Sequence, residues 1–216
     1  MKILEMRPRS YDKRMDRVSS GRVRVIKEAV ARAVPKNSHV LEIGSGTGEL
    51  AALMIERGCR VKGFDLSPSM VEEAEKRVER DDLEGNFSVW QMGVEGMDDL
   101  RVEDFDAVVS TLVFSELNDD ERRFALTHAA RVLRVGGLIV IADEVVPGKA
   151  IGRLLHCILR LPLNALTYLV SGQSTHPIAD LTHEISDAGF ILEKESRSHG
   201  DSFAIVVGRK KGKHAS

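Results

Sequence analysis

The chain has 216 residues, of which 43% are hydrophobic and 30% are charged, and its formal net charge is −2. This length suits one domain with a substantial core, and the near-neutral charge argues against a nucleic-acid partner held by a basic field. The two cysteines, Cys59 and Cys157, lie too far apart for metal-ligand spacing, and they fit a reducing, cytoplasmic location.

Strand and helix patterns alternate along the chain. Apolar runs bounded by turn residues predict strands, and apolar positions recurring every three or four residues predict helices. This alternation predicts a Rossmann-like α/β fold with a seven-stranded, doubly wound sheet. The last strand is expected to be antiparallel, since no helix separates it from the strand before it. Expected helices cover residues 22–34, 49–57, 68–78, 119–134 and 178–189, and expected strands cover 40–43, 60–65, 86–92, 106–112, 138–142, 190–196 and 202–208.

A glycine-rich turn follows the first expected strand. Residues 41–48 read Leu-Glu-Ile-Gly-Ser-Gly-Thr-Gly. Glycines permit positive φ angles and close approach of a ligand, and the following helix presents unpaired N–H groups. The G-x-G-x-G spacing, with an acid two residues ahead, differs from the G-x-G-x-x-G dinucleotide fingerprint and indicates S-adenosylmethionine (SAM). We therefore expect this cofactor to be bound by Glu42, Gly44, Ser45, Gly46 and Gly48.

The second expected strand ends at Asp65, which a doubly wound sheet places beside the glycine turn. A carboxylate here can accept hydrogen bonds from both ribose hydroxyls of SAM. The alternative is an acid that caps the helix beginning after Ser67. The nearby glycine turn favours ribose binding, and we expect Leu66 and Met70 to pack on the adenine faces.

The glycine turn, Asp65 and the seven-strand pattern together resemble class I SAM-dependent methyltransferases, over residues from about 20 to 209. The resemblance implies SAM as methyl donor and S-adenosylhomocysteine as product. Related enzymes often carry Asp where this chain has Gly93, so adenine recognition is expected to rest on backbone groups of Met92, Gly93 and Val94. Ser110 and Thr111 end the fourth strand, beside the place for the methionine part of SAM, and their backbone groups could meet its amino group. The alternative for the two side chains is a hydroxyl satisfied inside the sheet.

Several segments resemble a narrower family, the corrinoid protein-associated methyltransferases. The family name implies association with a corrinoid protein and not an established methyl acceptor. Two departures are visible, because Ser45 stands where Cys is frequent and Val135 stands where Pro commonly precedes the glycine pair; neither removes a group needed for SAM. The segments are Arg9-Ser10-Tyr11-Asp12, Met92-Gly93-Val94-Glu95, Phe114-Ser115-Glu116-Leu117, Ala142-Asp143-Glu144-Val145, Leu154-Leu155-His156, Arg160-Leu161-Pro162-Leu163, Thr167-Tyr168-Leu169 and Thr175-His176-Pro177.

Two regions are expected to cover the acceptor side. We divide the chain into an N-terminal lid segment, residues 1–20, and a methyltransferase domain, residues 21–216, with a helical acceptor lid at 148–177. Three interpretations of the lid stay open: an amphipathic cover packed on the domain, a basic stripe for an anionic substrate such as the carboxylates or phosphate of a corrinoid, and a helix over 151–171 on a membrane surface. The polar residues of the stripe are Arg153, His156, Arg160, Asn164, Thr167 and Ser171.

Candidate catalytic residues lie just past strand ends or in the lid. Glu116 and Asp143 follow the fourth and fifth expected strands, where active sites form in such sheets. Either could act as a base or orient the acceptor, and capping or loop roles stay open for both. His176 could face the acceptor or only precede a helix, and Tyr11 could close over the SAM carboxylate or pack on the lid. No metal site is expected, because the His and acidic residues show no strong ligand spacing.

These features predict a SAM-dependent methyltransferase whose acceptor is a small molecule or is linked to a corrinoid protein. A first alternative is a quinone or lipid C-methyltransferase at the membrane surface, since residues 151–190 are similar in layout to the ubiquinone and menaquinone C-methyltransferases. A second alternative is a SAM-binding accessory of a corrinoid protein without turnover of its own. A general base is needed only if the acceptor atom arrives protonated.

Overall fold

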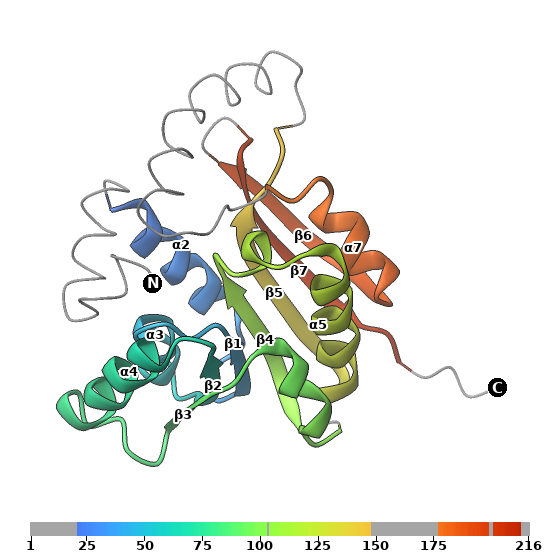
Figure 1. The fold of residues 1–216 in the computed structure, drawn as a ribbon. Coiled ribbons are helices and arrows are strands. Elements are labelled where there is room, and N and C mark those ends of the chain that lie inside the picture. Colours follow the sequence, from blue (N-terminus) through green and yellow to red (C-terminus); the bar gives the residue numbers. More distant parts are fainter. Residues whose placement is uncertain (1–20, 103, 148–176, 199–200, 213–216) are drawn as a thin grey trace.

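The computed structural model describes residues 21–102, 104–147, 177–198 and 201–212, and these build one seven-stranded sheet in the order β3-β2-β1-β4-β5-β7-β6 (Figure 1). The strands are β1 (His39–Ile43), β2 (Arg60–Asp65), β3 (Phe87–Gln91), β4 (Phe105–Thr111), β5 (Leu133–Glu144), β6 (Phe190–Ser198) and β7 (Phe203–Lys210). The helices are α2 (Arg22–Ala33), α3 (Glu49–Ile55), α4 (Pro68–Arg80), α5 (Asp119–Val132) and α7 (Leu181–Asp187), with short 3₁₀ helices η2 (Val94–Asp99) and η3 (Phe114–Glu116).

The strand directions confirm the predicted fold class. Strands β1 to β5 pair in parallel, and β7 lies antiparallel between β5 and β6. The chain order runs outward from β1 through β2 to β3, and then returns across the sheet to β4 on the other side of β1. This reversal between β1 and β4 is the position at which doubly wound sheets bind ligands, beyond the carboxyl ends of the strands.

Two apolar layers cover the sheet, one on each face. Helices α2, α3 and α4 bury residues such as Val30, Met54 and Ala74 on one face. Helices α5 and α7 with η2 bury residues such as Leu126 and Ile185 on the other. Neighbouring strand residues alternate between the layers because successive side chains point to opposite faces. The central strands therefore carry apolar runs that are buried on both faces.

Two elements begin three or more residues away from their predicted starts. Strand β5 begins at Leu133 rather than at 138, because Leu133 already pairs with Phe105 before the register shifts at a β-bulge. The glycines at 136 and 137 therefore lie within the strand. Helix α7 begins at Leu181 rather than at 178, because Ile178 forms a parallel bridge with Val145 and the Asp180 side chain caps the helix.

Candidate functional site

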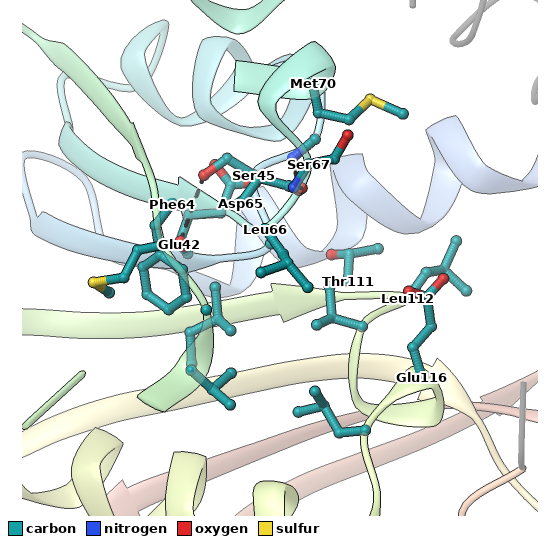
Figure 2. A pocket seen from close by; sticks show the side chains of 18 of the residues that line it. Glu42, Ser45, Phe64, Asp65, Leu66, Ser67, Met70, Thr111, Leu112 and Glu116 are labelled. Carbon is teal, nitrogen blue, oxygen red and sulfur yellow. Dashed lines mark hydrogen bonds between the residues drawn. The ribbon is translucent and has the colours of Figure 1, made fainter. Parts of the chain in front are cut away.

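A cavity of about 520 Å³ opens at the carboxyl ends of the central strands, within the range of small-molecule sites (Figure 2). Strands β1, β2 and β4 contribute Ile43, Asp65 and Thr111 to its wall, and helix α2 contributes Lys27. The sheet thus brings together residues that lie far apart in sequence. The cavity is also lined by Val23, Glu42, Gly44, Ser45, Gly46, Thr47, Leu50, Phe64, Leu66, Ser67, Pro68, Met70, Met92, Gly93, Val94, Glu95, Leu112, Val113, Glu116, Leu117 and Glu121.

The glycine turn adopts the backbone that its sequence predicts. Gly44, Gly46 and Gly48 have φ angles of 71°, 52° and 75°. A Cβ on Gly44 would overlap the side chain of Val113, and a Cβ on Gly48 would stand 2.8 Å from Phe87. Gly48 is the N-cap of α3, whereas Gly44 and Gly46 line the cavity. The turn is therefore held both by backbone conformation and by packing from Val113, which follows β4, and from Phe87 of β3.

Replacing Gly44 by alanine should lower the free energy of unfolding by about 2 kcal/mol, because the new methyl group meets both positive-φ strain and the Val113 side chain. Gly46→Ala is the matched control: its φ is also positive, but no atom lies within 4 Å of the new Cβ. Its loss should be only about 1 kcal/mol. Urea unfolding measures both variants, and equal losses would contradict the close packing inferred at Gly44.

Asp65 ties the glycine turn to the loop that follows β2. Its Oδ2 accepts a hydrogen bond from the Gly46 N–H at 2.9 Å, and its Oδ1 accepts one from the Ser67 N–H at 2.9 Å. The second contact holds the backbone just before α4, whose N-cap is Ser67 and not Asp65. Each carboxylate oxygen has two lone pairs and can accept more than one hydrogen bond, and Asp65 lines the cavity. Holding the Ser67 N–H and binding ribose are compatible roles for one side chain.

Glu42 is a buried carboxyl group in the cavity wall. The residue is 3% exposed, and its Oε2 has no hydrogen-bond partner in the part of the chain that the structure describes. Burial raises the pKa of Glu42 to about 8; nearby Lys27 opposes this rise, and Asp65 adds to it. An orphaned buried acceptor beside a cavity is a position that a cationic ligand group would satisfy.

Lys27 is a cavity residue that the sequence analysis missed. Its Nζ lies 2.6 Å from Oε2 of Glu49, the first residue of α3, and its side chain is only 16% exposed. The missed signal was its position in α2, four residues after Val23 and three before Val30, on the face otherwise buried against the core. A lysine there can place a positive charge inside the site while its stem packs on the helix.

The opposite end of the cavity is more apolar. Leu66, Met70, Met92 and Val94 all line it, together with the backbone of Gly93. The Met92 N–H donates to the Asp65 carbonyl at 3.1 Å, which fixes the loop after β3 against the loop after β2. This arrangement offers flat apolar surface next to the carboxylate of Asp65, as adenosine binding requires.

The hydroxyl groups of Ser110 and Thr111, neighbours in β4, have different surroundings. Ser110 is fully buried and its Oγ donates to the Ile43 carbonyl at 3.0 Å, so its side chain satisfies itself inside the sheet rather than lining the cavity. This placement is the alternative that the sequence left open for the Ser110 side chain. Thr111 lines the cavity instead, and its Oγ1 is buried without a hydrogen-bond partner among the described residues.

The two acidic candidates on the acceptor side differ. Glu116 lines the cavity, close to Leu112 in Figure 2. Asp143 does not line it: Asp143 is fully buried and accepts hydrogen bonds from the backbone N–H groups of Ser115 and Glu144. Burial raises the pKa of Asp143 to about 6. Asp143 therefore has the loop role that the sequence left open for it, because its carboxylate holds the Ser115 N–H in η3, the turn that carries Glu116.

Two predicted site residues, Tyr11 and His176, lie outside the described residues. The same applies to the predicted lid segment 1–20 and to all of the predicted acceptor lid, residues 148–177, except Pro177. Within the ranges that are described, no group of three His, Cys, Asp or Glu side chains is arranged to hold a metal ion.

Comparisons with known proteins find methyltransferases that are similar to this chain. A methyltransferase domain family matches residues 40–137, which include the glycine turn and Asp65. The chain is 29% identical over 167 residues to the demethylmenaquinone methyltransferase of Tropheryma whipplei (strain Twist), covering 74% of this chain and 66% of that protein.

Solved structures of methyltransferases share the fold. An O-methyltransferase family protein from Burkholderia thailandensis has a TM-score of 0.73 at 19% identity, covering 96% of this chain and 60% of that one. The 1,6-didemethyltoxoflavin-N1-methyltransferase of Burkholderia thailandensis, solved with 1,6-didemethyltoxoflavin and S-adenosylhomocysteine, has a TM-score of 0.70 at 18% identity, covering 94% and 84%. The chain spans 66% of the Tropheryma protein's length and about half of several other curated relatives.

Proposed function

We propose that this chain, which carries a class I SAM-dependent methyltransferase domain, transfers the methyl group of SAM to a small molecule. The observation that carries the proposal is one cavity that joins the glycine turn, Asp65 and two orphaned buried acceptors, Glu42 Oε2 and Thr111 Oγ1. A zwitterionic nucleoside such as SAM supplies the groups that these atoms lack. Its ribose provides two hydroxyl donors, and its methionine end provides an ammonium donor.

Some of the cavity residues bind the methyl donor, and others face the methyl acceptor. Asp65 accepts the ribose hydroxyls, Glu42 and Thr111 receive the ammonium group, and Lys27 faces the carboxylate. The acceptor enters from the side of Leu112, Val113 and Glu116, and its lone pair attacks the methyl carbon in line with the breaking carbon–sulfur bond. That bond's electron pair stays on sulfur, which yields S-adenosylhomocysteine. Positioning supplies much of the rate. If the acceptor atom carries a proton, Glu116 is placed to take it.

Two measurements in sequence test the proposal. Titration calorimetry should show SAM and S-adenosylhomocysteine binding to the purified chain, and no binding would overturn the proposal. Transfer of a labelled methyl group to a fractionated cell extract then identifies the acceptor. Binding without transfer to any acceptor would favour the accessory alternative, in which the chain holds SAM without turnover.

Replacing Lys27 by methionine should weaken SAM binding about tenfold, because an ammonium–carboxylate hydrogen bond is worth about 1.5 kcal/mol or more. The affinity for 5′-methylthioadenosine should not change, since that ligand lacks the amino-acid end. Lys36→Met, at an exposed turn away from the cavity, is the matched control. An equal loss for both ligands in Lys27→Met would instead assign Lys27 a structural role through Glu49.

A quinone acceptor is the second candidate, favoured by the likeness to a demethylmenaquinone methyltransferase. A quinone ring precursor is apolar and fits a wall made by Leu112, Val113 and Leu117. No helix in the described ranges is long and apolar enough to cross a bilayer. Labelled transfer to short-chain demethylmenaquinone, with and without liposomes, tests this candidate directly. Transfer that liposomes leave unchanged would remove the proposed membrane contact of residues 151–171.

A corrinoid-linked acceptor follows only from the resemblance of the sequence segments described above. The proposed lids, residues 1–20 and 148–177, would close over the acceptor in this as in the other cases. Corrinoids therefore belong in the same labelled-transfer series as the quinone. Label in the corrinoid fraction, and none in quinone or in other extract fractions, would assign that acceptor.

A further inference from the structure

The loop after β3 folds a carboxylate back over a glycine. A Cβ on Gly93 would overlap both carboxylate oxygens of Glu95, so the Glu95 side chain fills the space that Gly93 leaves open. The next glycine has a matching role, because a Cβ on Gly96 would stand 2.5 Å from Cγ and Sδ of Met92. The segment 92–96 thus uses two glycines to place two side chains, and Glu95 and Met92 both line the cavity.

Glu95 is exposed to solvent, and apolar side chains line the cavity near it. Leu66, Met70, Met92 and Val94 line this end of the cavity. In the part of the chain that the structure describes, the Glu95 carboxylate makes no hydrogen bond or ion pair that would occupy it. An acceptor-only group therefore stands at the edge of an apolar compartment, where a ligand with a hydrogen-bond donor on its rim would be recognised.

The neighbouring strands relate this compartment to Asp65. Strand β2 pairs with β3 so that Asp65 lies opposite Gln91, and the Met92 N–H donates to the Asp65 carbonyl. A nucleoside whose ribose is held at Asp65 would therefore extend its base toward residues 92–95. Adenine carries one donor group on its rim, the exocyclic 6-amino group, whereas hypoxanthine has an acceptor oxygen at that position and carries its donor on the neighbouring N1.

We propose that Glu95 is the specificity-determining residue for the base, accepting a hydrogen bond from the adenine 6-amino group, and that Gly93 exists to make room for it. This inference rests on the proposed function, because it requires SAM in the cavity with its ribose at Asp65. The sequence analysis assigned adenine recognition to backbone groups only, since Gly93 has no side chain. The structure places a side chain from two residues further along in the same space.

The test compares S-adenosylhomocysteine with its hypoxanthine analogue by calorimetry. The native chain should bind the adenine ligand at least tenfold more tightly, as one hydrogen bond to a charged group is worth about 1.5 kcal/mol or more. Glu95→Gln should lose most of this preference, because an amide can serve either ligand by turning over. Asp98→Gln, an exposed acid of η2 that does not line the cavity, is the matched control and should keep it.

A rescue experiment separates recognition from loop structure. Glu95→Ala should lose the preference, and the double variant Gly93→Asp with Glu95→Ala should regain it, because Gly93 has a φ of −88° that any residue adopts and the vacated space accepts the new carboxylate. Unchanged preference in Glu95→Gln, or equal loss for both ligands without rescue, would overturn the assignment. These outcomes differ from a failure of the proposed function, in which the native chain binds neither ligand.

Discussion

Replacing Asp65 by alanine should weaken SAM binding about a hundredfold. The carboxylate would accept both ribose hydroxyls, and two charge-assisted hydrogen bonds of about 1.5 kcal/mol each correspond to two factors of ten. The variant also releases the Gly46 and Ser67 N–H groups, which Asp65 holds at 2.9 Å in the structure. Calorimetric titration with SAM measures the total effect.

A ligand change separates these two contributions. The 2′-deoxy analogue of S-adenosylhomocysteine lacks one hydroxyl, so the native chain should bind it about tenfold less tightly than the parent compound. Asp65→Ala should bind both ligands alike, as expected when a mutation and a ligand change remove the same contact. Glu84→Ala, in the exposed turn after α4, is the control for loss of a carboxylate. A full preference for the parent compound in Asp65→Ala would contradict ribose binding at this residue.

Replacing Glu42 by glutamine should make the protein markedly more stable at pH 8 than the native chain, with little gain at pH 5. The ordinary pKa of this group is 4.5 and burial raises it to about 8 in the folded protein. Below pH 4.5 the carboxyl is protonated in both states. Between these values the unfolded chain releases the proton and the folded protein keeps it, so each pH unit favours unfolding by about 1.4 kcal/mol. Above pH 8 both states are charged and the penalty stops growing.

Urea unfolding of both proteins across pH 5 to 9 measures this difference. Asp143 also has a raised pKa, of about 6, but it is present in both proteins and its contribution cancels in the comparison. Glu84→Gln should follow the native curve at every pH, because that side chain is exposed. A difference between Glu42→Gln and the native chain that does not change with pH would show that Glu42 is already ionised in the folded state.

The strands could be predicted because each has a recognisable pattern of residues in its own sequence. A central strand buried on both faces carries a long apolar run, and such runs marked most of β4 and β5 and part of β1. The start of β5 was not visible, because it depends on pairing with Phe105, a residue distant in sequence. The start of α7 shifted for the same reason, since the bridge from Ile178 to Val145 takes that residue out of the expected helix.

The parts of the candidate site that depend on backbone conformation and strand order could be predicted from the sequence. Gly44 and Gly46 and the position of Asp65 follow from turn geometry and strand order, so sequence alone located them. Either Ser110 or Thr111 can point its side chain into the cavity, because neighbours in a strand face opposite sides. The pairing of β4 in the assembled sheet decides which of the two does so. Lys27 depends on how α2 lies against the cavity, which tertiary packing decides.

The contact between Gly44 and Val113 limits how this fold can change its substrate. Val113 lines the cavity on the side proposed for the acceptor, yet its side chain also fills the space above Gly44 in the turn proposed for the donor. A larger side chain at 113 would therefore press on the donor turn, and a smaller one would leave that turn unsupported. Leu112 and Leu117 also line the cavity, and neither is among the atoms packed against Gly44. Evolution or engineering of a new acceptor preference is freer at those two positions, where selection for a different substrate does not also act against the cofactor.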